Sequence, residues 1–254
     1  MAVSTSPESK AAPKSIALIT MSTRTPRVGP SVASFIHSIL SATPQVLSPE
    51  SATVQAVSSQ VNSTTTAAST SPSSITLKEL DLASFPLPVY NEPFIVPAML
   101  GAPGGPTQFT NPVAVSWSNE IKSHDGYVLV CPEYNYSASG GTKNAIDYLK
   151  NEWNGKPVMI VTYGVKGGNL AGEHLRGILT GMGLKVVQEK VELPFSSENK
   201  TELGYGADAL GATLQGALGE CTRKEWLERK GEVEKAWESF VGLVFEETDG
   251  EKKE

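Results

Sequence analysis

Two stretches of the chain carry side chains that could bind an anion and a flat ring. The first, Ser22–Gly29, places hydroxyl groups, two arginines and a glycine between an apolar strand-like run and a helix-like run. Backbone N–H groups at a helix N-terminus favour phosphate, and guanidinium groups add charge-assisted hydrogen bonds. An ordinary capped helix start with solvated arginines is the alternative. This stretch therefore predicts a phosphate site.

The second stretch, Tyr127–Leu149, is the one around which we expect the fold to be organised. Its apolar run stops at Pro132 and continues as Glu133, Tyr134 and Asn135 before helical spacing resumes. Near-continuous apolar runs are typical of buried parallel strands, whose carboxyl ends carry the binding loops of α/β sheets. Proline sets the exit direction, while tyrosine and asparagine offer an aromatic face and amide hydrogen bonds. The loop suits a flat ring with a polar edge.

The elements that must position these loops alternate along the chain. Apolar or alternating runs predict five strands, which cover residues 15–20, 75–82, 127–130, 156–162 and 184–193. Helical spacing predicts helices from about residue 31, over 112–123, around 145–149, over 169–182 with Gly183 as C-cap, and over 223–244. This alternation predicts an α/β fold, a doubly wound five-stranded parallel sheet in the order 2-1-3-4-5 with helices on both faces.

In that strand order the binding crevice lies between the first and third strands. It would bring the loop 22–29 beside the loop 132–141, with a third, glycine-rich loop at 164–168 on the far side. A phosphate cradle beside a ring-binding loop matches a phosphorylated cofactor with a flat heterocycle. The sequence therefore predicts that flavin mononucleotide (FMN) binds at this edge.

Composition narrows the class of protein. The chain has 254 residues, a net charge of −6 and two cysteines, so a nucleic-acid footprint, a disulfide scaffold and a zinc site are not expected. No apolar run approaches the roughly 20 residues of a membrane span, and the N-terminus lacks the apolar core of a signal peptide. We expect a cytoplasmic protein without membrane or nucleic-acid partners.

The chain is expected to form one domain with flexible additions. Residues 15–245 make up this predicted FMN-binding domain, 1–14 a disordered tail and 246–254 a charged tail. Residues 43–74 are rich in serine, threonine and alanine, and bury too little apolar surface to offset their ordering entropy. We interpret them as a flexible insertion, most simply a spacer, with regulation by phosphorylation as the alternative.

Four motifs resemble those of one family. They are STRTPRVG at 22–29, LPVYNEP at 87–93, PEYNYS at 132–137 followed by KNAIDYL at 143–149, and GVKGG at 164–168. Together they resemble the NADPH-dependent FMN reductase family, the flavodoxin-like NAD(P)H:flavin and quinone oxidoreductases. The resemblance runs from about Ser15 to Leu193, and PEYN at 132–135 with KNAID at 143–147 at this spacing is its most specific part.

The resemblance implies a cofactor site and a reaction. The FMN site would consist of Ser22, Thr23, Arg24, Arg27, Val28, Gly29, Pro132, Glu133, Tyr134, Asn135, Tyr136, Gly164, Gly167 and Gly168. NADPH or NADH would reduce the flavin, which would then reduce a flavin, quinone, azo compound or metal oxyanion. The cofactor carries this chemistry, so no catalytic acid or base and no metal is expected. Members of this kind commonly form homodimers or homotetramers.

Departures from the family pattern are also visible. Met21 stands where a glycine usually precedes the phosphate-loop serine, and Tyr136 where a small residue is common. The insertion at 43–74 is not a family feature. A non-catalytic flavin-binding sensor and a flavodoxin-type electron carrier remain alternative functions, although the arginines of the first loop count against the carrier.

Several single residues invite chemistry but have simpler interpretations. Cys131 ends an apolar strand and is expected to be buried packing. Lys143 and Asn144 are as well suited to capping their helix as to touching the flavin, and Lys166 is expected to be solvated. The histidines lack metal-ligand spacing and are expected at the surface or at helix caps; they are His37, His124 and His174. The tryptophans are expected in the core or an interface; they are Trp117, Trp153, Trp226 and Trp237.

Overall fold

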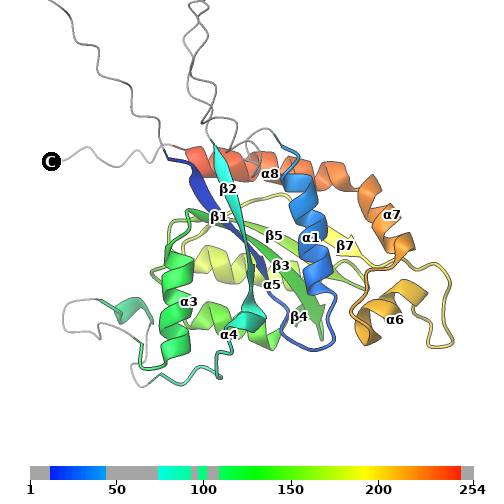
Figure 1. Cartoon of the computed structure of the whole chain (residues 1–254), viewed down its shortest axis with the longest axis horizontal. Coiled ribbons are helices and arrows are strands. Elements are labelled where there is room, and N and C mark those ends of the chain that lie inside the picture. The colour runs from blue at the N-terminus through cyan, green and yellow to red at the C-terminus, as the bar shows by residue number, and fades with distance from the viewer. Residues whose placement is uncertain (1–11, 44–73, 93–96, 102–108, 247–254) are drawn as a thin grey trace, which may run out of the picture.

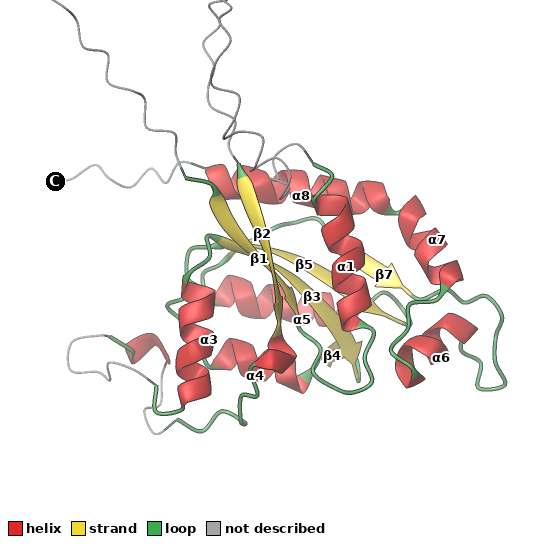
Figure 2. Ribbon diagram, viewed as in Figure 1, coloured by secondary structure: helices red, strands yellow, loops and turns green. Residues whose placement is uncertain are grey.

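Apolar segments from the whole length of the chain pair into one sheet. The computed structural model describes residues 12–43, 74–92, 97–101 and 109–246. Its strands are β1 (Lys14–Thr20), β2 (Ile75–Asp81), β3 (Gly126–Tyr134), β4 (Ser137–Ala138), β5 (Pro157–Gly164), β6 (Lys185–Val186) and β7 (Val191–Pro194). The order is β2-β1-β3-β5-β6, with β7 also beside β5 and β4 beside β3 (Figure 2). Only β4 runs antiparallel to its partner.

Helices connect these strands and cover the sheet. They are α1 (Gly29–Leu40), α3 (Pro112–Lys122), α4 (Gly140–Asp147), α5 (Asn169–Gly181), α6 (Ala207–Leu214), α7 (Glu220–Glu228) and α8 (Lys230–Phe245), with short 3-10 turns at Leu82–Ser84 and Pro97–Met99. Among the described residues, no helix combines the length and apolar character needed to span a bilayer.

Successive residues of the central strands face opposite sides, so the sheet supports two hydrophobic cores. Leu18 and Val130 pack with α1, α7 and α8 on one side. Ile19 and Leu129 pack with α3, α4 and α5 on the other (Figure 1). All four tryptophans are buried in these cores, as expected. The predicted α/β class with helices on both faces is confirmed, and the carboxyl ends of β1, β3 and β5 share one edge.

The predicted fifth strand is divided in two. β6 pairs with the start of β5 and β7 with its end, so both occupy the fifth position of the sheet. Between them Arg176 of α5 donates to the carbonyl oxygens of Val187, Gln188 and Glu189, which supports a bend. The order 2-1-3-4-5 becomes β2-β1-β3-β5-β6 because the short β4 takes a number and the last strand is interrupted.

Other boundaries differ from the predictions. The predicted closing helix is divided at Arg229 into α7 and α8, and Trp226 Nε1 on α7 donates to the Pro194 carbonyl oxygen. The helix α6 was not predicted. Leu170, in the first turn of α5, is 38% exposed although the helical spacing would place it with the inward residues. His124 was expected at the surface or at a cap but is buried between Ser15 and Glu120. Residues 44–73, and with them most of the predicted insertion, lie outside the described residues.

Candidate cofactor site

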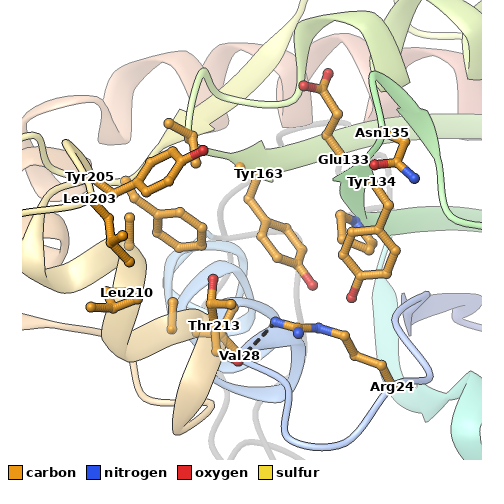
Figure 3. A pocket seen from close by; sticks show the side chains of 16 residues that line it. Arg24, Val28, Glu133, Tyr134, Asn135, Tyr163, Leu203, Tyr205, Leu210 and Thr213 are labelled. Atoms are coloured by element: carbon orange, nitrogen blue, oxygen red, sulfur yellow. Dashed lines mark hydrogen bonds between the residues drawn. The ribbon is translucent and has the colours of Figure 1, made fainter.

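A cavity of about 670 Å³ lies at the carboxyl edge of the sheet. The loop after β1 and the ends of β3 and β5 supply one part of its wall, and the segment after β7 supplies the rest (Figure 3). It is lined by Arg24, Val28, Pro132, Glu133, Tyr134, Asn135, Tyr163, Gly164, Val165, Phe195, Leu203, Tyr205, Ala209, Leu210, Ala212 and Thr213. The volume is within the range of about 300–1,000 Å³ that is usual for ligand pockets.

The first two predicted loops are in direct contact. The Arg24 guanidinium lies over the Tyr134 ring at 5.7 Å. Directly beside the two loops, Thr142 Oγ1 donates to the Met21 carbonyl oxygen at 3.1 Å. Met21, noted above as a departure from the expected glycine, is fully buried in the core. The crevice predicted between the first and third strands is therefore present.

The N-terminus of α1 has the features of an anion site. In the described part of the chain no side chain caps its first amides, and Pro30 follows directly after Gly29. The Ser22 hydroxyl is buried beside this end and has no hydrogen-bond partner among the described residues. A Cβ at Gly29 would lie 2.0 Å from Ser22 Oγ and 2.9 Å from Tyr163 Oη, so only glycine allows this approach. Free N–H groups and hydroxyls thus gather at the positive end of a helix dipole.

The two arginines of this loop point to different partners. Arg24 is exposed, lines the cavity and donates to the Thr213 carbonyl oxygen at the end of α6. Arg27 instead forms two hydrogen bonds with Asp81 and one with the Ser22 carbonyl oxygen. Arg24 therefore faces the candidate ligand space, while Arg27 anchors the loop to β2.

The second loop is a two-residue hairpin turn. Tyr134 pairs with Ser137, and the residues between them, Asn135 and Tyr136, have φ values of 49° and 63°. Two positive φ values are typical of the type I′ turn, which asparagine tolerates and tyrosine rarely adopts. Asn135 lines the cavity, whereas the Tyr136 side chain is 70% exposed and is not among the lining residues.

Glu133 links the second loop to the third. Its Oε2 accepts hydrogen bonds from the N–H groups of Leu170 and Ala171 at 3.0 and 3.1 Å, so it caps α5 from another element. A second connection joins Ser137 Oγ and His174 Nδ1 at 2.9 Å. Hairpin and helix are thereby held together.

The glycines of the third loop allow backbone conformations and close contacts that other residues would not. Gly167 and Gly168 both have φ values of 79°, and a Cβ at Gly168 would lie 2.8 Å from Thr162 Cβ. Gly164 lines the cavity, but neither Gly167 nor Gly168 does so. These two residues form a tight left-handed turn that starts α5.

Comparison with known proteins identifies the family. Residues 15–198 match the model of the NADPH-dependent FMN reductase family, which is more than half of the chain. The chain belongs to this family. It is therefore an NAD(P)H-dependent oxidoreductase that uses FMN, as the four motifs indicate.

Individual relatives agree with this assignment. This chain is 39% identical over 232 residues to an NAD(P)H-dependent FMN reductase of Nectria sp, and the match covers 90% of this chain and 96% of the relative. It is 29% identical to an NAD(P)H-dependent FMN reductase of Schizosaccharomyces pombe, covering 69% and 76%. A solved oxidoreductase from Corynebacterium diphtheriae, 16% identical, superposes with a TM-score of 0.53 over 94% of this chain and all of that one, which shows the fold.

The residues present fit FMN. The lining of a cavity large enough for a ring system includes the exposed Arg24 and Val28, the N-cap residue of the uncapped helix α1. The unpartnered hydroxyl of Ser22 is buried behind this lining. Among the predicted site residues, those that line the cavity are Arg24, Val28, Pro132, Glu133, Tyr134, Asn135 and Gly164. The predicted residues outside its lining are Ser22, Thr23, Arg27, Gly29, Tyr136, Gly167 and Gly168.

Sequence reasoning missed the far wall of this cavity. Phe195, Leu203, Tyr205 and Leu210 come from a segment to which no element was assigned. The pattern around Tyr205, an aromatic residue between Gly204 and Gly206, is a turn signal that would have pointed to it.

Other candidates have structural roles. Burial raises the pKa of the Cys131 thiol well above its usual value, which confirms a packing residue. Asn144 neither caps its helix nor lines the cavity, since it bonds the backbone of Pro88 and Tyr90 and holds the loop 87–93 against α4. Ser139 caps α4. The described residues contain no cluster of side chains suited to a metal ion.

Proposed function

We propose that this FMN reductase holds the phosphate of FMN at the N-terminus of α1 and the isoalloxazine ring against the hairpin turn at 132–136. The observation that carries this proposal is the conjunction of an open helix N-terminus with the cavity on the same sheet edge. Ser22, Thr23 and Arg24 would bind the phosphate. Pro132, Tyr134 and Asn135 would border the ring, and Gly164 would allow it to approach the end of β5.

When bound, FMN would supply the redox chemistry that links NADPH or NADH to an electron acceptor. The chain's own residues orient the ring and exclude water. Tyr163 lines the cavity, where its neutral hydroxyl can donate a hydrogen bond, and burial raises the pKa of this hydroxyl further above its usual value. No side chain is assigned as catalytic acid or base.

Arg27, Tyr136, Gly167 and Gly168 would act indirectly. Arg27 would hold the phosphate loop through Asp81, and the two glycines would shape the turn before α5. Tyr136 would stand at the rim of the site on a strained backbone, where it can meet an acceptor or a second subunit. Strained residues of this kind cluster at functional sites.

Oligomeric state and location complete the proposal. We propose a cytoplasmic homodimer or homotetramer that acts on small-molecule acceptors, with FMN bound within the domain formed by residues 15–245. Size-exclusion chromatography with light scattering tests the assembly, since a monomer at micromolar concentration would contradict it.

The decisive experiment is a titration of the purified chain with FMN, followed by anaerobic addition of NADPH or NADH. We expect a stoichiometric yellow complex whose absorbance near the visible flavin band disappears on reduction and returns with an acceptor. Riboflavin, which lacks the phosphate, should bind more weakly. A chain that binds FMN and riboflavin equally would contradict the phosphate site.

A further inference from the structure

A small hairpin at residues 199–206 stands at the mouth of the cavity. Lys200 forms an antiparallel bridge with Gly206, and the N–H and Oγ1 of Thr201 both donate to the Tyr205 carbonyl oxygen at 2.8 and 2.9 Å. The hairpin presents Leu203 and Tyr205, which line the cavity although they are 70% and 50% exposed. Figure 3 shows both on the side opposite Tyr134 and Asn135.

The backbone, not side-chain burial, determines where this hairpin lies. Gly204 has a φ of 77° and its N–H donates to the Thr201 carbonyl oxygen, which closes the turn. A Cβ at Gly206 would lie 2.1 Å from the Ser196 carbonyl oxygen, so the hairpin packs closely on the segment after β7. Large apolar side chains held in the open beside a cavity mark a binding surface.

The cavity wall next to the hairpin is apolar and includes small side chains that leave room for a ligand. Phe195 lies edge-on to Tyr163 at 6.2 Å between ring centroids, and α6 contributes the small residues Ala209 and Ala212 beside Leu210. Aromatic side chains favour stacked or edge-on contact with another ring. This wall suits a ligand that carries a ring.

The charged groups of the cavity are already engaged. Arg24 and Glu133 are the charged residues among its lining. Glu133 caps α5, and Arg24 contacts the Thr213 carbonyl oxygen and is the residue that we assign to the cofactor phosphate. Beyond these two residues the lining offers no charged side chain that could pair with a charge carried by the acceptor, and burying an unpaired charge is costly.

We propose that Leu203 and Tyr205 select the electron acceptor, and that they favour an uncharged, ring-bearing, apolar acceptor over its charged analogue. This inference rests on the proposed function, since it assigns the acceptor side of the same site. The two side chains would cover the apolar body of the acceptor and lose their exposure on binding. They are specificity-determining residues and take no part in hydride transfer.

A matched pair of probes tests the inference. The FMN-loaded chain is dialysed in its oxidised state against 1,4-naphthoquinone or its 2-sulfonate, and the dissociation constant of each probe is measured without NAD(P)H. Leu203→Ser and Tyr205→Ser should each raise the dissociation constant of the naphthoquinone by roughly tenfold, since each removes apolar surface that the ligand would bury. The constant for the sulfonate should change by less than about threefold.

Matched controls are available on neighbouring helices. Leu214 on α6 and Leu227 on α7 are 63% and 55% exposed, and neither lines the cavity. Leu214→Ser and Leu227→Ser should leave the dissociation constants of both probes within about twofold of the unsubstituted chain. Far-ultraviolet circular dichroism of each variant checks that the fold is retained.

Two results would overturn the inference. One is a Leu203→Ser/Tyr205→Ser double variant that still binds the naphthoquinone as the unsubstituted chain does. The other is a double variant that binds FMN itself more weakly, because the hairpin would then belong to the cofactor site. If the unsubstituted holoprotein does not oxidise NADPH or NADH at all, it is the proposed function that fails, so the two failures are distinguishable.

Discussion

Two helices, α1 and α5, begin at the same edge of the sheet, but their N-terminal amide groups differ in whether a side chain caps them. The amides at the start of α1 have no side-chain cap in the described structure, and the Ser22 hydroxyl beside them is unpartnered. The amides at the start of α5 are capped, because those of Leu170 and Ala171 donate hydrogen bonds to the Glu133 carboxylate. Both helices follow a strand and a glycine-containing loop, yet only α1 presents an open positive end.

The difference shows that glycine between a strand and a helix has two distinct uses. Gly29 has no positive φ, and it is required because Ser22 and Tyr163 approach its Cα closely. Gly168 is required because its backbone is left-handed and its Cα lies against β5. The first use brings polar groups to a ligand, and the second lets the chain turn. The predictions below test this contrast, from the largest expected effect to the smallest.

Gly168→Ala should be the most damaging change. A side chain there combines a left-handed backbone with a Cβ 3.0 Å from the Tyr163 amide nitrogen. We expect the free energy of unfolding to fall by about 2–4 kcal/mol. Urea denaturation measures it. Gly177→Ala on the same helix has open space around its Cβ and should be neutral or stabilising by up to about 1 kcal/mol. Equal losses at both positions would contradict this account.

Arg24→Ala should weaken FMN binding by about tenfold to a hundredfold, the usual effect of losing a charge-assisted hydrogen bond. Riboflavin affinity should barely change, because it lacks the phosphate that Arg24 would bind. Lys166→Ala is the control, since this exposed lysine lies in the loop before the capped N-terminus of α5. Isothermal titration with both ligands decides the matter, and a parallel loss of riboflavin affinity would point to a structural role for Arg24.

Glu133→Ala should lower the free energy of unfolding by about 1–2 kcal/mol, because it leaves the first amides of α5 unpaired. Glu133→Gln should lose less, since an amide oxygen still accepts hydrogen bonds. Hydrogen exchange at Leu170 and Ala171, whose N–H groups bind Glu133, localises the effect. Unchanged protection of these two amides in the alanine variant would show that the carboxylate is not their essential partner.

Asp81→Asn should have the smallest effect, a loss of about 0.5–1 kcal/mol, because its ion pair with Arg27 is partly exposed. The asparagine can still accept a hydrogen bond from the Ala83 amide, so the turn after β2 keeps its cap. A double-mutant cycle with Arg27→Ala isolates the pair. Additive effects would mean that Arg27 anchors the phosphate loop through Ser22 alone.

Local patterns were sufficient for much of this molecule. Apolar runs predicted β1, β5 and the buried part of β3, since strands buried on both faces must be nearly continuous in apolar residues. The predicted end of the third strand at Val130 is wrong, because β3 continues through Pro132 to Tyr134 by pairing with β5 and β4. Helical spacing predicted α3 and α5. The C-cap of α5 is Met182 and not the predicted Gly183, which follows it with a φ of 86°. The convergence of the loops at 22–29 and 132–141 followed from the strand order. Contacts between distant segments were not accessible in this way.

The sequence by itself determined the α/β class, the strands that carry the site and the chemistry suited to it, because these depend on periodicity and residue type along a short stretch. Only the tertiary structure decided that Arg27 turns to Asp81, that Glu133 closes α5 and that residues 195–213 complete the cavity. The physical reason is that a polar or apolar side chain can pair with several groups far apart in the chain. Which of them it contacts depends on how the folded chain brings them together.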